Sequence, residues 1–388
     1  MKLSNFFSKL YLTERLSGGV VSLYTNRTIQ QIAGGLLGIF LPIFLLERYR
    51  SISLVLVFYG VGFLFYLLLA ALGAIIASKI DFRRALIASV LGGTFFYISM
   101  YFFELNIWFF SALALLAVTV DRMFYWVPYH SALAKFTNKK TRGRTLALLS
   151  VIVALLGVGL PVLAGFIITY HGFNVLFLIV IFVYLSSAIP FLTMPAIDES
   201  YSFGYWQTWK LLFHPRERRM LIGYMADGAQ DFIAAVIWPI FIWQIMNNDY
   251  RSLGILSSLI VLASVTLTLV MGRYTDKFDK KKLLHYGTIL YSLGWVSKFF
   301  IQTGFHIFVT STYHNFTTIA MRSPFDALAY EKAADSGHYV DEYSVLREMA
   351  VQLGRILAII ILLILLNFLD LKFAFALAAV IALFINFI

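Results

Sequence analysis

About twelve apolar runs, each long enough to cross a lipid bilayer, are the feature that most constrains how this chain folds. A helix needs ~20 apolar residues to cross the hydrocarbon core. The chain has 388 residues, of which 60% are hydrophobic and only 13% are charged. Because backbone polar groups find no water in lipid, such runs predict membrane-spanning helices joined by short turns. The predicted runs are 20–46, 52–77, 84–103, 107–133, 144–169, 173–194, 218–245, 251–272, 283–303, 306–332, 343–367 and 371–388.

Basic residues are shared unequally between the two sets of turns. Of the 31 Lys and Arg residues, we place 22 on one side of the membrane, 4 on the other and five inside apolar runs. Cytoplasmic loops carry the excess of Lys and Arg, so the rich side and the N-terminus are predicted to be cytoplasmic. The net charge of +11 is then explained by topology and by attraction to lipid headgroups. We therefore expect the lipid bilayer, and no nucleic acid, as a partner.

Several chemistries are excluded by what the chain lacks. It contains no cysteine, which removes disulfide bonds, thiolate metal sites and a cysteine nucleophile. The histidine spacing gives no metal site, and neither a G-x-x-x-x-G-K-[ST] loop nor an H-E-x-x-H motif is present. We predict no metal, no cofactor and no enzyme activity. The N-terminus has no signal-peptide pattern, so the first span is expected to remain in a multi-pass protein of the cell (cytoplasmic) membrane.

The sequence contains an internal repeat with an offset of about half the chain length. The turn 272–284, GRYTDKFDKKKLL, has a degenerate copy at 74–86, AIIASKIDFRRAL, at an offset of 198 residues. Matches in the same order, at a nearly constant offset, indicate two parallel halves, as in some membrane transporters. Three further matches have offsets of 196 or 197 residues: Pro42-Ile43-Phe44 with Pro239-Ile240-Phe241, Pro128 with Pro324, and Gly157 with Gly354.

This repeat predicts the fold and its division. We expect an all-α integral membrane protein with twelve transmembrane helices in two pseudo-symmetric six-helix bundles. The N-terminal bundle covers 1–194, a cytoplasmic linker covers 195–217, and the C-terminal bundle covers 218–388. Prolines at repeat-related positions permit helix bends that suit rocking of two halves, although static kinks are the alternative.

The turn 272–284 also resembles a motif of the major facilitator superfamily, G-x-x-x-D-[RK]-x-G-[RK]-[RK]. It keeps Gly272, Asp276 and Lys277, whereas the first copy has Ser78 where the aspartate would be. The resemblance covers the whole chain at the level of architecture. It implies a transporter built from two six-helix bundles, in which runs one, four, seven and ten line a central cavity. The fifth run contains GVGLPVLAG, which is similar to a glycine–proline pattern of that superfamily's exporters and favours export.

The resemblance also implies a cytoplasmic gate, because it places Asp276 near the start of the fifth helix, at 142–145. A helix N-terminus carries about half a positive charge, so a carboxylate there gains ~0.3–1 kcal/mol. We call this contact between Asp276 and the helix end the latch. It is expected to be stronger at the second copy of the turn, since Ser78 offers no charge at the symmetry-related place. A basic turn that only sets topology is the alternative. The predicted gate residues are Ser78, Arg83, Arg144, Asp276, Lys277 and Lys281.

Charged residues inside the membrane are the candidates for a functional site, because each costs ~2.5–3.5 kcal/mol on insertion scales. Runs three, six and twelve contain no charged residue in their apolar stretch, whereas runs one, four, seven and ten all do. The resemblance implies the same division between lipid-facing and cavity-lining helices. The candidates for substrate binding or coupling are Arg27, Gln31, Asp121, Arg122, Asp227, Asp231, His314 and Arg355.

The two acidic residues of the seventh run have three interpretations. Asp227 and Asp231 are four residues apart and share a helix face. Two carboxylates so placed in a low dielectric resist being ionised together, which is one way to carry a proton. Alternatively, each forms a structural bridge with Arg355 or Arg122, or contacts the substrate directly. The two arginines in turn either anchor an anionic substrate group or neutralise these carboxylates.

Together these features predict a secondary active transporter that moves a small organic solute by alternating access. The expected coupling ion is H+, and the expected state is a monomer. A membrane scaffold or receptor that kept the fold and lost transport is the alternative. The charges in mid-membrane weigh against it, because a passive bundle has no reason to keep them.

Overall fold

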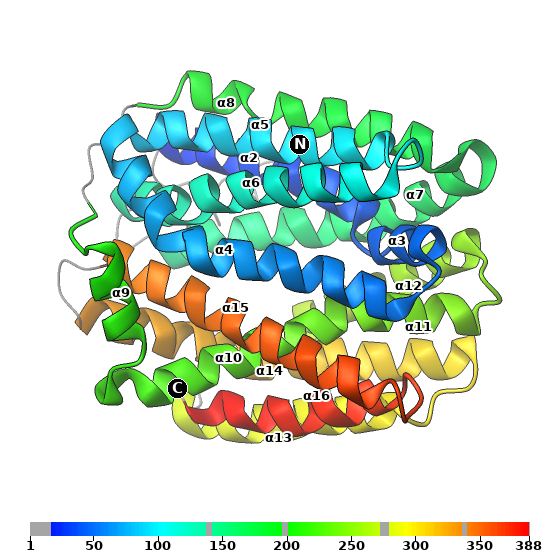
Figure 1. Ribbon diagram of the computed structural model, residues 1–388. Coiled ribbons are helices and arrows are strands. Elements are labelled where there is room, and N and C mark those ends of the chain that lie inside the picture. The colour runs from blue at the N-terminus through cyan, green and yellow to red at the C-terminus, as the bar shows by residue number, and fades with distance from the viewer. Residues whose placement is uncertain (1–16, 137–141, 196–200, 272–278, 336–339, 388) are drawn as a thin grey trace, which may run out of the picture.

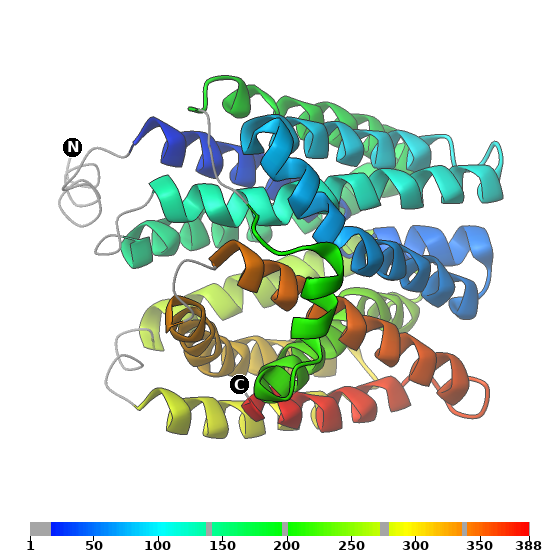
Figure 2. The same cartoon turned by 60° about the vertical axis from the view of Figure 1, so that its left-hand side comes forward.

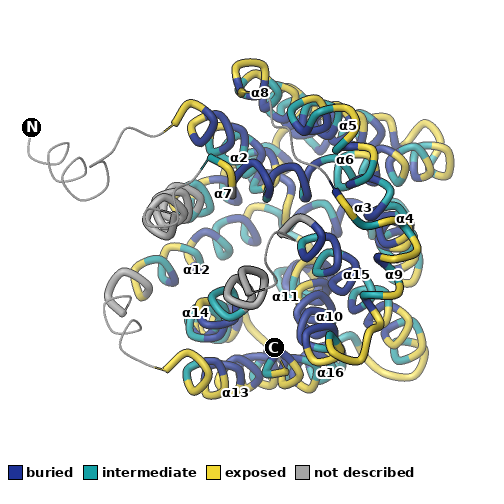
Figure 3. Tube along the Cα trace, turned by 90° about the vertical axis from the view of Figure 1, so that its left-hand side faces the viewer, coloured by how far each residue is buried: buried dark blue, intermediate teal, exposed yellow. Residues whose placement is uncertain are grey.

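The apolar runs fold into long helices that lie side by side (Figure 1). The computed structural model describes residues 17–136, 142–195, 201–271, 279–335 and 340–387; within these ranges the side chains of 134, 142–153, 268–271, 329–335 and 340–341 are not described. The N-terminal half forms the upper part of Figure 1 and the C-terminal half the lower part. Large apolar side chains such as Trp108, Phe182 and Phe368 are exposed, as lipid contact requires. Along many helices, exposed and buried residues alternate around the helix (Figure 3).

The first half begins with a bent pair of helices. The first helix ends at Leu37, the second begins at Leu41, and their axes differ by 42°. Pro42 lies in the first turn of the second helix, where its missing N–H leaves no hydrogen bond unmade. The helices of this half are α2 (Gly18–Leu37), α3 (Leu41–Tyr49), α4 (Ile52–Ile80), α5 (Phe82–Tyr101), α6 (Ile107–Phe136), α7 (Arg142–Ser186) and α8 (Ile189–Leu192).

The second half interrupts its first span at the matching place. A π-helical turn, η2 (Ile233–Ile237), separates α10 (Arg218–Phe232) from α11 (Trp238–Ile245). Pro239 lies in the first turn of α11, so this proline and its repeat partner Pro42 both lie where a helix restarts. The remaining helices are α12 (Tyr250–Met271), α13 (Lys280–Lys298), α14 (Gly304–Asp335), α15 (Val340–Leu365), α16 (Phe373–Leu383) and η4 (Phe384–Phe387).

The chain reverses inside α7, at Gly172. This residue has a φ of +79°, which side chains other than glycine rarely adopt. It separates the predicted runs 144–169 and 173–194, and the ribbon turns back at this end of the bundle (Figure 1). By length and composition, seven of the described helices can cross a membrane, or eight if α2 and α3 form one span. Every predicted run falls on a helix, but twelve crossings are not confirmed.

The two halves meet mainly where α7 packs along α12 and α4 packs along α15. At the first crossing, a Cβ on Gly165 would lie 2.6 Å from the carbonyl oxygen of Tyr250. A Cβ on Gly254 would lie 2.4 Å from the carbonyl oxygen of Pro161. Glycines allow helix backbones to approach this closely. The glycine–proline pattern of the fifth predicted run therefore lies at an interface between the halves.

The segment between the halves is anchored to the start of α15. The N–H and the hydroxyl of Ser202 donate to Glu342 Oε1 at 2.9 and 2.5 Å. From there the chain passes α9 (Tyr205–Leu212), which packs on α4 and α15, and η1 (Pro215–Glu217). Figure 2 shows this ribbon crossing from the upper to the lower half. The boundaries 1–194, 195–217 and 218–388 given above for the two bundles and the linker remain a prediction.

The repeated turn caps the next helix in both halves. Asp81 accepts a hydrogen bond from the N–H of Arg83 at 3.0 Å, at the start of α5. Asp279 accepts one from the N–H of Lys282 at 3.0 Å, at the start of α13. The two aspartates are 198 residues apart, which is the offset of the repeat. An aspartate at this position satisfies a backbone donor that has no partner within the helix.

Candidate functional site

A cavity of about 430 Å³ lies within the C-terminal half, among α10, α11, α12, α13 and α14. Its wall also includes Ile39 of the first half. Apolar and polar side chains both face it, as is typical of small-molecule sites. Its polar lining residues include Gln230, Asp231, Tyr291, Lys298, Ser311, His314 and Arg322.

The two carboxylates of α10 are held by different arginines. Asp227 is only 4% exposed and forms an ion pair with Arg322 of α14. One turn further along, the side chain of Asp231 is 52% exposed and accepts a hydrogen bond from Arg355 Nη2 at 2.7 Å. The carboxylates share a helix but not a counter-charge. Asp227 is therefore enclosed, whereas Asp231 is open to the cavity.

A smaller cavity of about 240 Å³ lies in the N-terminal half, among α4, α5, α6 and α7. Asp121 and Arg122 of α6 line it. The hydroxyl of Tyr184 donates to Asp121 Oδ1 at 3.0 Å. Gly93 makes room for that tyrosine, since a Cβ there would lie 2.3 Å from its ring. The charged pair predicted in the fourth run thus faces a cavity of its own half.

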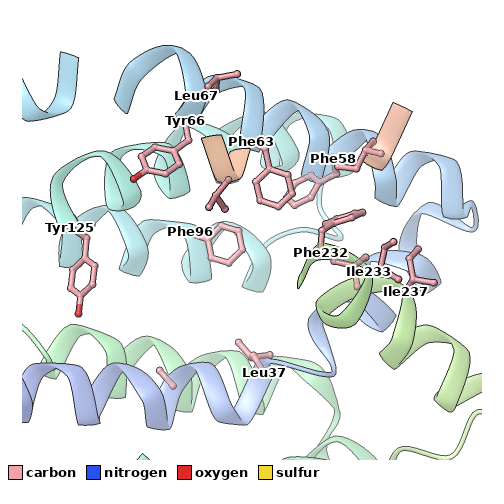
Figure 4. Packing of buried hydrophobic residues seen from close by; sticks show 14 of the residues in the cluster. Leu37, Phe58, Phe63, Tyr66, Leu67, Phe96, Tyr125, Phe232, Ile233 and Ile237 are labelled. Atoms are coloured by element: carbon pink, nitrogen blue, oxygen red, sulfur yellow. The ribbon is translucent and has the colours of Figure 1, made fainter. Parts of the chain in front are cut away.

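Phe63 of α4 joins the charged residues of the two halves. The guanidinium carbons of Arg122, from the first half, and Arg355, from the second, each lie 5.1 Å from the centre of its ring. Both cations are attracted by the negative faces of one ring. The ring also packs edge-on against Phe232 of α10 at 5.7 Å, as Figure 4 shows. Arg355 therefore contacts Asp231 in its own half and Phe63 in the other.

The other predicted site residues lie apart from this ion pair. The guanidinium of Arg27 lies 5.2 Å from the ring centre of Trp126, and Gln31, one turn further along α2, is partly exposed. His314 lines the larger cavity, and its ring lies 4.4 Å from that of Tyr291. The predicted residues are thus spread over two cavities and the face of α2, and do not form one cluster.

The predicted cytoplasmic gate is described only in part. Asp276, Lys277 and the side chain of Arg144 lie outside the described residues, so the latch stays a prediction. Lys281 is exposed in the first turn of α13, and the Ser78 hydroxyl donates to a carbonyl of its own helix.

Arg83 joins two elements at this end of the first half. Its Nη1 donates to the carbonyl oxygen of Met194 at 3.3 Å, and its Nε lies 4.0 Å from Asp81 Oδ2. It thereby links the start of α5 to the end of the sixth predicted run. This contact lies within one half, which is consistent with a structural role.

Several residues that line these cavities, among them Arg322, Lys298 and Tyr184, are absent from the predicted set. Arg322 and Lys298 are two of the five basic residues inside apolar runs, so their charge marks them in the sequence. Tyr184 is an uncharged aromatic residue in an aromatic-rich chain, and no sequence pattern marks it. Within the described part of the chain, no three His, Asp or Glu side chains are placed to hold a metal ion.

Repeated helical halves, lipid-exposed outer faces and cavities with buried charges define a multi-pass membrane protein of the transporter class. A comparison with models of protein families matches the chain to the Major Facilitator Superfamily over residues 23–218 and 220–388. The chain therefore belongs to this superfamily and is a membrane transporter of its type, not an enzyme. A search of the curated proteins finds no match.

Proposed function

We propose that this transporter is secondary active, moves a small organic solute by alternating access and couples that movement to protons through Asp231. The ion pair between Asp231 and Arg355 carries the proposal. The carboxylate is open to the larger cavity, and the guanidinium also contacts Phe63 of the opposite half. When a proton binds Asp231, the carboxylate loses the charge that holds Arg355. Since Arg355 touches both halves, this release alters their contact.

Asp227 supports this role by contrast. It is enclosed, it pairs with Arg322, and it accepts a hydrogen bond from Gln230 Nε2 at 3.3 Å. Because its carboxylate is buried, Asp227 resists exchange with protons or solute, since breaking the pair leaves an uncompensated buried charge. Within α10, Asp227 therefore serves as the structural carboxylate and Asp231 as the exchangeable one.

Export is the favoured direction of transport. It rests on the similarity of the fifth predicted run to the glycine–proline pattern of exporters. The position of Pro161 and Gly165 against Gly254 of α12 supports a role for that pattern at the interface where the halves move. Bends at such prolines suit rocking around a site near the membrane midplane.

Proton flux in proteoliposomes tests the coupling. The purified chain is reconstituted with a trapped pH indicator, and carboxylates, amides, amines and sugars are added outside in turn. At least one solute is expected to move protons through the wild type, and Asp231→Asn is expected to reduce this flux at least tenfold. An unchanged flux in Asp231→Asn would show that protons do not pass through this residue.

The same measurement decides between the transporter and its alternative. A scaffold or receptor on this fold moves no protons with any solute, even where solute binding is measurable. An exposed lysine provides the control for reconstitution, because Lys372→Met lies outside both cavities and is expected to keep the wild-type flux.

A further inference from the structure

A lysine is buried at the wall of the larger cavity. Lys298 is the last residue of α13 and is 2% exposed. Its Nζ lies 3.9 Å from the ring centre of Trp295 and 4.3 Å from that of Trp238. The faces of these rings attract a cation, but they carry no net charge and do not neutralise it. A charge enclosed in a low dielectric is costly until a counter-charge reaches it.

The other charges at this cavity already have partners. Asp231 pairs with Arg355, and Arg322 pairs with Asp227 and, at 3.7 Å, with Asp326. Within the described residues, no carboxylate lies at ion-pair distance from Lys298. Among the residues that line the cavity, Lys298 and Arg322 are basic and Asp231 is acidic, so the described wall carries one positive charge in excess.

Two more buried polar atoms at the wall of this cavity make no hydrogen bond within the described residues. They are Ser311 Oγ and His314 Nδ1, and both residues line the same cavity as Lys298. Ser311 and His314 are three residues apart on α14 and so share a helix face. The His314 ring is fixed by its neighbours, with ring centres 4.4 Å away at Tyr291 and 4.7 Å away at Trp295.

We propose that this cavity binds a monoanionic organic carboxylate, with its carboxylate group on Lys298 and the hydroxyl of Ser311. One unbalanced lysine matches one negative charge. A carboxylate also accepts the hydrogen bonds that the lysine and the serine leave unmade, and such charge-assisted bonds are strong. The apolar body of the solute lies against Ile242, Leu253 and Ile260, which line the same cavity. The inference rests on the proposed function, because it names the class of the transported solute.

The size of the cavity agrees with this assignment. A volume of about 430 Å³ lies in the range of small-molecule sites. The wall places Lys298 at one end of α13, whereas its other charged residues, Asp231 and Arg322, already form ion pairs. A neutral solute would leave Lys298 without a counter-charge, and a cation would be repelled by it. The positive charge of Lys298 therefore selects anions, and the apolar side chains of the wall favour solutes with an apolar body.

Thermal unfolding of the purified full chain tests the proposal with matched probes. Benzoate, phenylacetate and 3-phenylpropanoate are compared with their amides, which keep the shape and lose the charge. At least one carboxylate is expected to raise the Tm with increasing concentration, and its amide is not, because a ligand of the folded state stabilises it. Lys298→Met is expected to weaken this response at least tenfold, and Lys298→Arg to keep it.

Two further variants separate binding from folding. Ser311→Ala is expected to weaken carboxylate binding several-fold while the chain stays folded. Lys372→Met makes the same substitution at an exposed position outside the cavity and is expected to behave as the wild type. Equal responses to amides and carboxylates, an unchanged carboxylate response in Lys298→Met, or no response to any carboxylate each overturns the anion site.

Failure of this inference is distinguishable from failure of the proposed function. Carboxylate binding that depends on Lys298, without proton flux in proteoliposomes, overturns proton-coupled transport and keeps the site. Proton flux driven by amides or sugars, with no carboxylate response, keeps transport and overturns the site.

Discussion

Arg355→Met is expected to abolish pH-dependent transport and to lower the free energy of unfolding by about 2 kcal/mol. Removing one partner of a fully buried ion pair costs ~3–5 kcal/mol, because a charge remains uncompensated. The side chain of Asp231 is half exposed, so water screens part of this loss. Transport is expected to fail because protonation of Asp231 can no longer break and re-form its ion pair with Arg355. Thermal unfolding and proton flux measure the two effects.

The double variant Asp231→Asn, Arg355→Met separates the effect on stability from the effect on transport. It removes both charges, so most of the lost stability is expected to return, while transport stays absent. Arg84→Met is the matched control, since Arg84 is exposed at the start of α5 and lines neither cavity. Wild-type flux in Arg355→Met, or a double variant less stable than the single one, would contradict the account of this pair.

Gly354→Ala is expected to destabilise the protein by about 3 kcal/mol or more, at the upper end of what overpacking costs. A Cβ at this position would lie 1.9 Å from the carbonyl oxygen of Met225. The opposing helix is equally close, since a Cβ on Gly228 would lie 2.3 Å from the carbonyl oxygen of Val351. Backbone atoms cannot rotate away as a side chain does, so α10 and α15 must separate. The Tm and the folded yield after purification report the effect.

The repeat supplies the control for this substitution. Gly157 is the partner of Gly354 in the sequence repeat, and a Cβ there would lie 3.5 Å from Val261, which is ordinary contact. Gly157→Ala is therefore expected to be neutral or slightly stabilising, because alanine favours the helix. Similar losses of stability in both variants would show that the α10–α15 crossing is not the cause.

The sequence predicts the fold through features that act locally. Apolar runs mark the helices, and the prolines Pro42 and Pro239 coincide with the helix restarts of the two halves. The repeated turn is informative because a helix cap needs only neighbouring residues, as Asp81 and Asp279 show. The break at Gly172, whose backbone is not helical, also falls between two predicted runs, 144–169 and 173–194.

The candidate site is less predictable because its contacts join distant residues. The sequence marks Asp227 and Asp231 as charges, but the choice between Arg322 and Arg355 as partners depends on how α10, α14 and α15 pack. Phe63 gives no signal at all, since a phenylalanine in an apolar run has no distinguishing mark. Its position between two arginines comes from the packing of α4 against both α6 and α15.

Distances between spin labels at the two ends of the bundle test alternating access most directly. The chain contains no cysteine, so paired cysteines label it without background. One pair, Lys79→Cys with Lys281→Cys, reports one end, and Arg50→Cys with Lys372→Cys reports the other; all four positions are exposed. Lowering the pH is expected to change the two distances in opposite directions, and Asp231→Asn is expected to remove the response. A single fixed distance at both ends, or both ends moving together, would contradict alternating access.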